Sequence, residues 1–280
     1  MASRSHWLVC AAAAIFALWP ATAPAQGRLE ASYTVTLAGI PIGKGDWSLD
    51  VSELSYTASA NGRTTGLLRV FSSGHGETNA NGTFNGGHLA SATYVSTITS
   101  SKKADTIRLT LSDGNVKEAK LDPPQDPDPE RVPVTEAHEH GVLDPMSAAL
   151  MRPPGNGDAM APETCQRTLA IFDGRIRYDL QLAFKRMEPV KAEKGYNGPA
   201  LVCAVYFTPV AGYVPSRAAI RYISKSRDME IWLAPVAGTR VLVPIRAQGP
   251  TPIGPVVLAA DKFVALAVPS RASANGSKTQ

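Results

Sequence analysis

The residues of this 280-residue sequence whose types and spacing could do chemistry are few, and the sharpest group is "TEAHEHG". His138 and His140 lie two apart, so on an extended chain their imidazoles would project from the same side. They could share a Zn(II) or Cu(II) ion, with Glu136 or Asp144 completing the ligands. However, a Pro-rich connector does not provide the surrounding hydrogen bonds that orient metal ligands. A polar loop that happens to hold two histidines is therefore the favoured interpretation, and a metal site is the alternative.

Motifs for nucleophilic or cofactor chemistry are absent from the sequence. It contains no G-x-S-x-G elbow, no H-E-x-x-H helix, no Gly-rich phosphate loop after a strand and no C-x-x-C. Its carboxylates in "DPDPE" lie on a Pro-rich loop that would not hold a glycosidase pair rigidly. The sequence thus predicts a protein that is not an enzyme and carries no cofactor.

The first 25 residues have the pattern of a secretory signal peptide. A short apolar run, "WLVCAAAAIFALW", follows Arg4 and His6 and is ended by Pro20, with small residues at Ala23 and Ala25. We expect cleavage after Ala25 and a periplasmic mature protein. No later segment is long and apolar enough to be a membrane-spanning helix, so an integral membrane protein is not expected.

Cys165 and Cys203 are the cysteines that remain after the predicted cleavage. Strand alternation places both on inward faces, and two buried thiols in an oxidising compartment most simply form a disulfide. Closing a loop of about 38 residues would stabilise the fold by roughly 4 kcal/mol in the chain-entropy model. A catalytic thiol would need an exposed electropositive pocket, and no histidine lies near either cysteine in sequence. The sequence predicts a structural disulfide between Cys165 and Cys203.

The charge of the mature chain argues against nucleic acid as a partner. Loss of the signal removes Arg4 and no acidic residue, which leaves 27 basic and 24 acidic residues and a net charge of +3. No block of like charges concentrates that small excess.

Period-two alternation interrupted by Gly and Asn is the dominant pattern and indicates antiparallel strands. Turns are predicted through Gly39 to Gly43, at Asn61-Gly62, at Asn81-Gly82, at Asn85 to Gly87 and at Asp113-Gly114. About a dozen strands with one short helix favour a mainly β fold: a large curled antiparallel sheet, a partly closed barrel or spiral, wrapped around that central helix. A two-layer sandwich is the alternative.

We expect a single β-rich domain over residues 26–268, with strand-rich halves at 30–120 and 163–266. Residues 121–141 are too rich in Pro and Asp for a central strand or a helix and read as an exposed connector. The helix is predicted at 144–152, with Asp144 as N-cap, Pro145 in the first turn and Pro153 ending it. "AAIRYISKSRDMEIWLAP" is interpreted as a continuation of the strands. Residues 269–280 are predicted to be a disordered tail.

A hairpin folded across Asp173-Gly174 shows the alternation most clearly, with Ile171 expected opposite Ile176 and Leu169 opposite Tyr178. Its apolar face and the helix supply candidate ligand-lining residues: Met146, Leu150, Leu169, Ile171, Ile176, Tyr178, Leu180 and Leu182. Ordinary core packing is the competing interpretation of the same residues. The arginines fall on the other face, and with two later ones they form a possible basic contact face: Arg175, Arg177, Arg217 and Arg221.

Several segments together resemble a family of exported proteins known as the domain of unknown function numbered 3108. They are "CQRTLAIFDGRIRYDL", "YNGPALVCAVYFTPVAGY", "LDPMSAAL" and "TVTLAGIPIGKGDWSLDV". The resemblance covers about 30–263 and implies a periplasmic all-β protein of alphaproteobacteria with no assigned activity, so it carries over no catalytic residue. By a looser, fold-level analogy, the predicted architecture looks like envelope proteins whose curled sheet wraps a helix.

The function that these observations favour is a non-enzymatic periplasmic envelope protein that binds a lipid-like ligand or a peptide in its curved sheet. A structural module that docks on envelope components through the basic face is the alternative, and a metal-binding role through His138 and His140 comes third.

Overall fold

The computed structural model describes residues 26–66, 74–85, 88–100, 103–153, 155 and 157–268. The predicted signal peptide, the 269–280 tail and the expected turn at Gly86-Gly87 lie outside these residues. The described strands are β1 (Gly27–Leu37), β2 (Ile40–Val51), β3 (Ser55–Thr64), β4 (Gly74–Asn85), β5 (His88–Ser100), β6 (Lys103–Ser112), β7 (Asn115–Asp122), β8 (Arg167–Phe172), β9 (Arg177–Lys191), β10 (Lys194–Gly195), β11 (Asn197–Ala211), β12 (Met229–Pro235), β13 (Leu242–Thr251) and β14 (Gly254–Ala267). Among the described residues, no helix has the length and apolar character needed to span a membrane.

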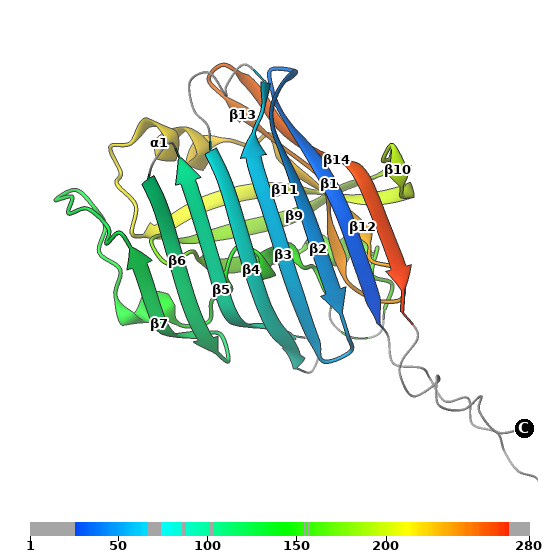
Figure 1. The fold of residues 1–280 in the computed structure, drawn as a ribbon, viewed down its shortest axis with the longest axis horizontal. Helices are drawn as coiled ribbons and strands as arrows, with labels where there is room; N and C mark the ends of the chain where they lie inside the picture. The colour runs from blue at the N-terminus through cyan, green and yellow to red at the C-terminus, as the bar shows by residue number, and fades with distance from the viewer. Residues whose placement is uncertain are drawn as a thin grey trace, which may run out of the picture.

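All of these strands belong to one 14-stranded sheet in the order β7-β6-β5-β4-β3-β2-β1-β14-β13-β12-β11-β9-β8, with β10 paired to β14. Every pairing is antiparallel except that of β10. Figure 1 shows β1 to β7 as a broad twisted layer, with β9, β11 and β12 crossing behind it. The predicted fold class, a large curled antiparallel sheet that is not fully closed, is confirmed.

The two edge strands, β7 and β8, do not pair with each other, and a short extended segment lies between them. The backbone N–H of Val142 donates to the carbonyl of Gly114 in the β6–β7 turn (2.8 Å), and Leu143 exchanges hydrogen bonds with Ala170 and Phe172 of β8 (2.9 Å each). Val142 and Phe172 are buried with Leu109 of β6 in one apolar cluster. The backbone hydrogen bonds of Val142 and Leu143 and this apolar cluster thus link the two edges, which do not pair directly.

The main core lies between the two layers of the sheet. It joins inward residues of β1, β2 and β3 to those of β11, β12 and β13, among them Leu29, Leu49, Val202, Trp232 and Val243. Along β1 and β2 these positions follow the period-two alternation that the sequence shows, whereas β11, β12 and β13 bury consecutive apolar residues.

The central helix expected over 144–152 is wrong: the segment makes a single 3-10 turn, η3 (Ser147–Ala149). The N-cap of this turn is Met146 rather than the predicted Asp144, although Asp144 Oδ1 accepts the backbone N–H groups of Met146 and Ser147 at 2.9 Å each. The turn ends because Met151 becomes extended and exchanges two backbone hydrogen bonds with Leu242 of β13, both 2.8 Å. Pairing of Met151 with the first residue of β13 therefore stops the helix before Pro153.

The α-helix of the described residues is α1 (Ala218–Lys225), which lies in a segment predicted to be a strand. Ile220 and Tyr222 fit a period of two, whereas Ile220 and Ile223 fit the i, i+3 spacing of a helix. The hydroxyl of Ser224 donates to the carbonyl of Ile220 (2.7 Å), a local bond typical of a helical turn.

Two of the predicted turns are interior to strands. Asn61-Gly62 lies within β3 and Asn81-Gly82 within β4, where the register shifts at a bulge. A Cβ at Gly82 would lie 2.1 Å from the carbonyl oxygen of Ala90, so glycine serves close packing there. The first turn is shorter than expected, with β2 already beginning at Ile40. The Asp113-Gly114 turn is confirmed, with φ of 50° and 75°.

The β8–β9 hairpin has a longer loop than predicted. Leu169 pairs with Leu180 and Ile171 with Tyr178, because the loop spans Asp173 to Ile176. The Asp173 carboxylate fixes this loop by accepting the backbone N–H groups of Arg175 (2.8 Å) and Ile176 (2.7 Å). The register moves by an even number of residues, so each side chain keeps its predicted face.

Candidate functional site

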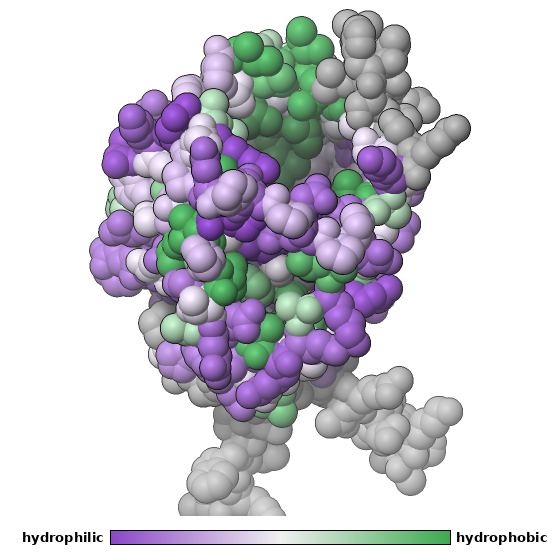
Figure 2. Space-filling view, turned by 90° about the vertical axis from the view of Figure 1, so that its left-hand side faces the viewer, coloured by the Kyte–Doolittle hydropathy of each residue, from purple (hydrophilic) through white to green (hydrophobic). Residues whose placement is uncertain are grey.

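A cavity of about 510 Å³ opens between the layers, near the end of the sheet that carries the β1–β2 turn. This volume is in the range of small-molecule sites, roughly 300–1,000 Å³. Figure 2 shows a hollow with apolar residues inside it toward the top of that view. The wall is formed by Tyr33, Val35, Gly43, Lys44, Gly45, Asp46, Trp47, Ala60, Asn61, Gly62, Arg63, Thr78, Tyr94, Pro145, Met146, Ala149, Pro244 and Leu258.

Glycines on adjacent strands create this space. Tyr33 pairs with Gly45, Gly45 with Gly62, and Gly62 with Gly76, so the glycines form one row across β2, β3 and β4. They share the inward parity of Trp47 and Ala60, which also line the cavity. A Cβ at Gly62 would meet only the Lys44 carbonyl oxygen, at 3.8 Å. The inner face therefore lacks side chains where the sheet would otherwise be filled.

The charged and amide residues of the wall alternate with these glycines along the strands. Lys44, Asp46, Asn61 and Arg63 are exposed. Because successive side chains of a strand point to opposite faces, they contribute to the wall through their backbone. What a ligand would meet inside is thus mainly hydrocarbon and aromatic surface, from residues such as Val35, Trp47, Met146 and Leu258.

Two phenols of the cavity wall, Tyr33 and Tyr94, are buried. The Tyr33 hydroxyl donates to the carbonyl of Pro244 (2.7 Å), and burial raises the pKa of Tyr33 above its ordinary value. Burial also raises the pKa of Tyr94. Neither phenol is poised to act as a base near neutral pH.

A buried polar network adjoins Pro145 and Met146 behind the wall. The Ser147 hydroxyl donates to Asp144 Oδ2 and also contacts the hydroxyl of Tyr56. Burial raises the pKa of Asp144, while its hydrogen bonds from Ser147 oppose that shift. The network holds the η3 turn against β3 and so fixes the position of Met146 in the cavity wall.

Of the eight predicted lining residues, the cavity wall contains Met146. Leu150 and Leu169 line a separate pocket of about 330 Å³. Ile171 and Leu182 are buried in the packed interior, and Ile176, Tyr178 and Leu180 are half-buried on the β8–β9 hairpin. Core packing is thus the structural role of Ile171 and Leu182.

Most of the wall was missed by sequence reasoning, including Tyr33, Trp47 and Leu258. The available signal was the glycines at 43, 45 and 62, of which Gly43 and Gly62 were interpreted as turn residues. Glycine inside a strand pattern also marks a place where something approaches the backbone closely.

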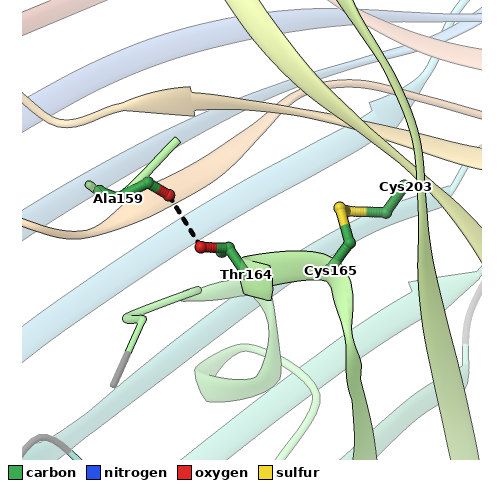
Figure 3. The surroundings of a disulfide bond; sticks show 4 residues. All are labelled: Ala159, Thr164, Cys165 and Cys203. Carbon is green, nitrogen blue, oxygen red and sulfur yellow. Dashed lines mark hydrogen bonds between the residues drawn. A yellow bond between two sulfur atoms is a disulfide. The ribbon is translucent and has the colours of Figure 1, made fainter. Parts of the chain in front are cut away.

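The predicted Cys165–Cys203 disulfide is confirmed, with an S–S distance of 2.04 Å and a Cα–Cα distance of 5.5 Å. It joins β11 to the 3-10 turn η4 (Pro162–Cys165), where the Thr164 hydroxyl donates to the carbonyl of Ala159 at 2.9 Å (Figure 3). Both cysteines are fully buried, with Leu201 and Leu233 in the same cluster. That cluster is separate from the one that borders the cavity.

Arg175 and Arg177 do not form the solvated basic face that the alternation predicted. Their side chains are only 24% and 13% exposed, and they form ion pairs with Asp105 (2.6 Å) and Asp179 (2.7 Å). The closeness of the β8–β9 loop to β6 explains the burial. Arg217 and Arg221 are exposed, at the start of and within α1.

The two histidines lie on a 3-10 turn, η2 (Glu136–Glu139), and its C-cap rather than on an extended chain. His138 Nδ1 accepts the backbone N–H of Thr135 (3.1 Å), and His140 Nδ1 lies 2.7 Å from the side-chain oxygen of Asn115. Within the described part of the chain, no group of three or more His, Cys, Asp or Glu residues could hold a metal ion. Metal binding here stays a prediction without geometric support.

Comparison with known proteins adds a fold likeness and a family. No curated protein matches the chain. A crystal structure described as a "Beta-barrel-like Protein of Domain of Unknown Function DUF1849 from Brucella abortus" is similar over 87% of this chain and 98% of that one, with a TM-score of 0.48 and 11% identity. The model of the family described as "Protein of unknown function (DUF3108)" matches residues 32–261, and the chain therefore belongs to that family.

Proposed function

We propose that this protein is a non-enzymatic, periplasmic cell-envelope protein that holds a lipid-like amphiphile in the cavity between its two layers. The observation that carries the proposal is the cavity of about 510 Å³, whose inward wall is built from glycines and apolar side chains. Ordinary protein interiors contain few voids larger than a water molecule. Apolar surface left open at this scale favours an apolar ligand, at about 25 cal/mol per Å² buried.

The groups around the cavity support binding rather than catalysis. Tyr33 has its hydroxyl engaged with Pro244 and its pKa raised by burial. Asp144 is fully buried behind the wall, where Ser147 and Met146 occupy its oxygens. These groups fix the position of the cavity wall. Binding of an amphiphile requires from the wall only a complementary shape and apolar contacts.

The periplasmic part of the proposal is supported by the signal-like sequence at 1–25 and by the Cys165–Cys203 disulfide. Disulfides persist in oxidising compartments such as the bacterial periplasm. Expression of the full chain followed by cell fractionation tests it. Recovery of the shortened chain in the cytoplasmic fraction would contradict it.

The ligand is tested by purifying the native protein without detergent, extracting it with organic solvent and analysing the extract by mass spectrometry. We expect an amphiphile in near-stoichiometric amount. An extract free of amphiphiles, combined with no binding of a fluorescent long-chain fatty acid, would remove the proposal.

A cavity-filling variant gives the matched comparison. Gly62→Leu places a side chain where the structure is open, and we expect fatty-acid affinity to fall about tenfold as roughly two ligand methylenes, each worth about 0.8 kcal/mol, lose their place. Gly157→Leu is the control, because a Cβ at Gly157 meets nothing within 4 Å and the residue lies outside the cavity wall. Equal affinities for the two variants, both folded by circular dichroism, would count against this cavity as the site.

A further inference from the structure

Two turns meet at the end of the sheet where the cavity opens. The β1–β2 turn contains Ala38 and the β13–β14 turn precedes Gly254, and the backbone N–H of Ala38 donates to the carbonyl of Pro255 at 2.8 Å. A Cβ at Gly254 would lie 2.8 Å from that of Ala38. Val35 and Gly43 of the cavity wall lie just inside the β1–β2 turn. These turns and the cavity opening therefore belong to one surface, which we call the mouth end.

Large apolar side chains stand in solvent on this surface. Ile253 in the β13–β14 turn is 72% exposed, and Ile40, the first residue of β2 after the β1–β2 turn, is 55% exposed. Ile98 is 57% exposed on β5, opposite Gly76 of the glycine row. A turn tip needs no isoleucine for its geometry, and polar or glycine residues are usual there. Exposed apolar residues clustered around a cavity opening mark a surface that is covered by something apolar.

Basic residues stand directly opposite one another beside these tips. Lys44 pairs with Arg63, and Arg63 pairs with His75, on the outer face of β2, β3 and β4. Lys44 and Arg63 are exposed and form no ion pair or side-chain hydrogen bond with any residue that the structure describes. Like charges directly opposite across antiparallel strands destabilise the pairing. An anionic surface placed against them would offset that repulsion.

The charges are also ordered along the strands. The next outward row, one step farther from the mouth end, contains Asp46, Asn61 and Glu77. The unpaired cations thus lie nearer the exposed isoleucines than the acids do. This order, apolar at the tip, then basic, then acidic, matches the order of environments met at an anionic bilayer: acyl region, headgroup phosphate and water.

We infer that the mouth end docks on an anionic phospholipid bilayer, with Ile40 and Ile253 inserted at the boundary between headgroups and acyl chains and Lys44 and Arg63 against the phosphates. The cavity then opens toward the membrane surface. The inference goes beyond ligand binding, because it assigns the protein a lipid surface as a partner and an orientation on it.

Vesicle flotation of the mature protein tests the docking. With vesicles of phosphatidylglycerol and phosphatidylethanolamine at low salt, we expect the wild-type protein to float, and with phosphatidylcholine alone to bind much less. Lys44→Gln/Arg63→Gln should lower partitioning about 10- to 30-fold, and high salt should abolish most of the binding. Ile40→Ser/Ile253→Ser should weaken binding to vesicles of either composition.

Matched controls keep the charge and apolar changes while moving them elsewhere. Lys117→Gln/Lys191→Gln removes the same charge from exposed positions on β7 and β9. Leu54→Ser changes a residue that is 70% exposed in the β2–β3 turn, at the opposite end of the sheet. Both controls should float like the wild type. Equal losses in controls and test variants would overturn the inference.

Orientation has its own readout. Ile253→Trp should show a blue-shifted emission with anionic vesicles, whereas Leu54→Trp should not; a shift at Leu54→Trp alone, or no flotation of the wild type, would overturn the docking. The two experiments distinguish membrane docking from amphiphile binding. If the protein floats with vesicles but yields no amphiphile, docking is supported and the carrier function is removed. If the protein yields an amphiphile but never floats, only docking is overturned.

Discussion

Asp144 brings a carboxyl group into the interior and uses it to begin a turn. It is fully buried, and its oxygens accept the backbone N–H groups of Met146 and Ser147 and the hydroxyl of Ser147. Burial disfavours the ionised form and raises its pKa above 3.8, while the hydrogen bonds act in the opposite direction. The residue is thus structurally useful but costs stability when charged.

This predicts a pH-dependent difference between the wild type and Asp144→Asn. A folded-state pKa above the unfolded value means that the folded state binds the proton more tightly. The wild type should therefore gain unfolding free energy relative to Asp144→Asn as the pH falls through the folded pKa toward 3.8, and lose it again as the pH rises. Asp173, whose pKa burial also raises, is present in both proteins and cancels. Urea unfolding across this pH range measures the difference. If the unfolding free energies of the two proteins change in parallel with pH, the raised pKa of Asp144 is refuted.

At the scale of elements, the Pro-rich connector is pinned to the end of β11 rather than loosely attached. The backbone N–H of Gly212 donates to the carbonyl of Val132 (2.7 Å), that of Val132 donates to Tyr213 (2.9 Å), and the Arg131 guanidinium donates to the carbonyl of Gly212 (2.8 Å). Gly212 has φ of +78°, and a Cβ there would lie 1.8 Å from the carbonyl oxygen of Arg175. One glycine therefore holds the connector, β11 and the β8–β9 loop together.

Gly212→Ala should destabilise the protein by more than about 2 kcal/mol, since backbone strain adds to a clash with another backbone segment. Gly39→Ala is the control: its φ is +82°, but a Cβ there meets nothing within 4 Å. The free energy of unfolding of the control should fall by only about 1 kcal/mol, which is the strain of an alanine in the left-handed conformation. Thermal unfolding compares them, and equal losses would show that the contact at Gly212 is unimportant.

Secondary structure was predictable where the apolar residues followed one spacing. It was not predictable where they fitted both the strand and the helix spacing. The alternation of β1 and β2 predicted strands because their inward residues, such as Leu29 and Leu49, are all apolar. The α1 segment, which has no buried residue, matched both periods, so the spacing of its apolar residues could not decide between strand and helix. The cavity was not predictable for a related reason: Gly62 looks like a hairpin signal beside Asn61, and only the pairing with Gly45 and Gly76 shows that it faces inward.

At the scale of the molecule, the disulfide and the cavity belong to different parts of the core. Cys165 and Cys203 pack with Leu201 and Leu233, whereas the cavity borders the larger cluster around Trp47. The pairing of the two cysteines was predictable from the expected signal peptide and from inward parity. The strand order was not, because nothing local indicates that β1 lies beside β14.

Removing the disulfide should therefore lower stability without altering the site. For Cys165→Ala/Cys203→Ala we expect the free energy of unfolding to fall by roughly 4 kcal/mol, because the unfolded chain regains the entropy of the open loop. Fatty-acid affinity should be unchanged below the unfolding transition. Urea unfolding gives the first quantity and fluorescence titration the second. A variant that stays folded yet no longer binds the probe would contradict this separation.

The pairing of β1 with β14 makes the two ends of the domain mutually dependent. Gly27 lies opposite Ala267 and Leu37 opposite Val256, so the opening strand stays half-paired until the closing one arrives. A nascent chain cannot complete its interior while translation is unfinished, and long-range pairing of this kind is slow to form. A truncated product would be left with bare strand edges at its centre, open to aggregation and proteases. Pairing of β1 with β14 therefore completes the sheet only in a chain that extends through β14.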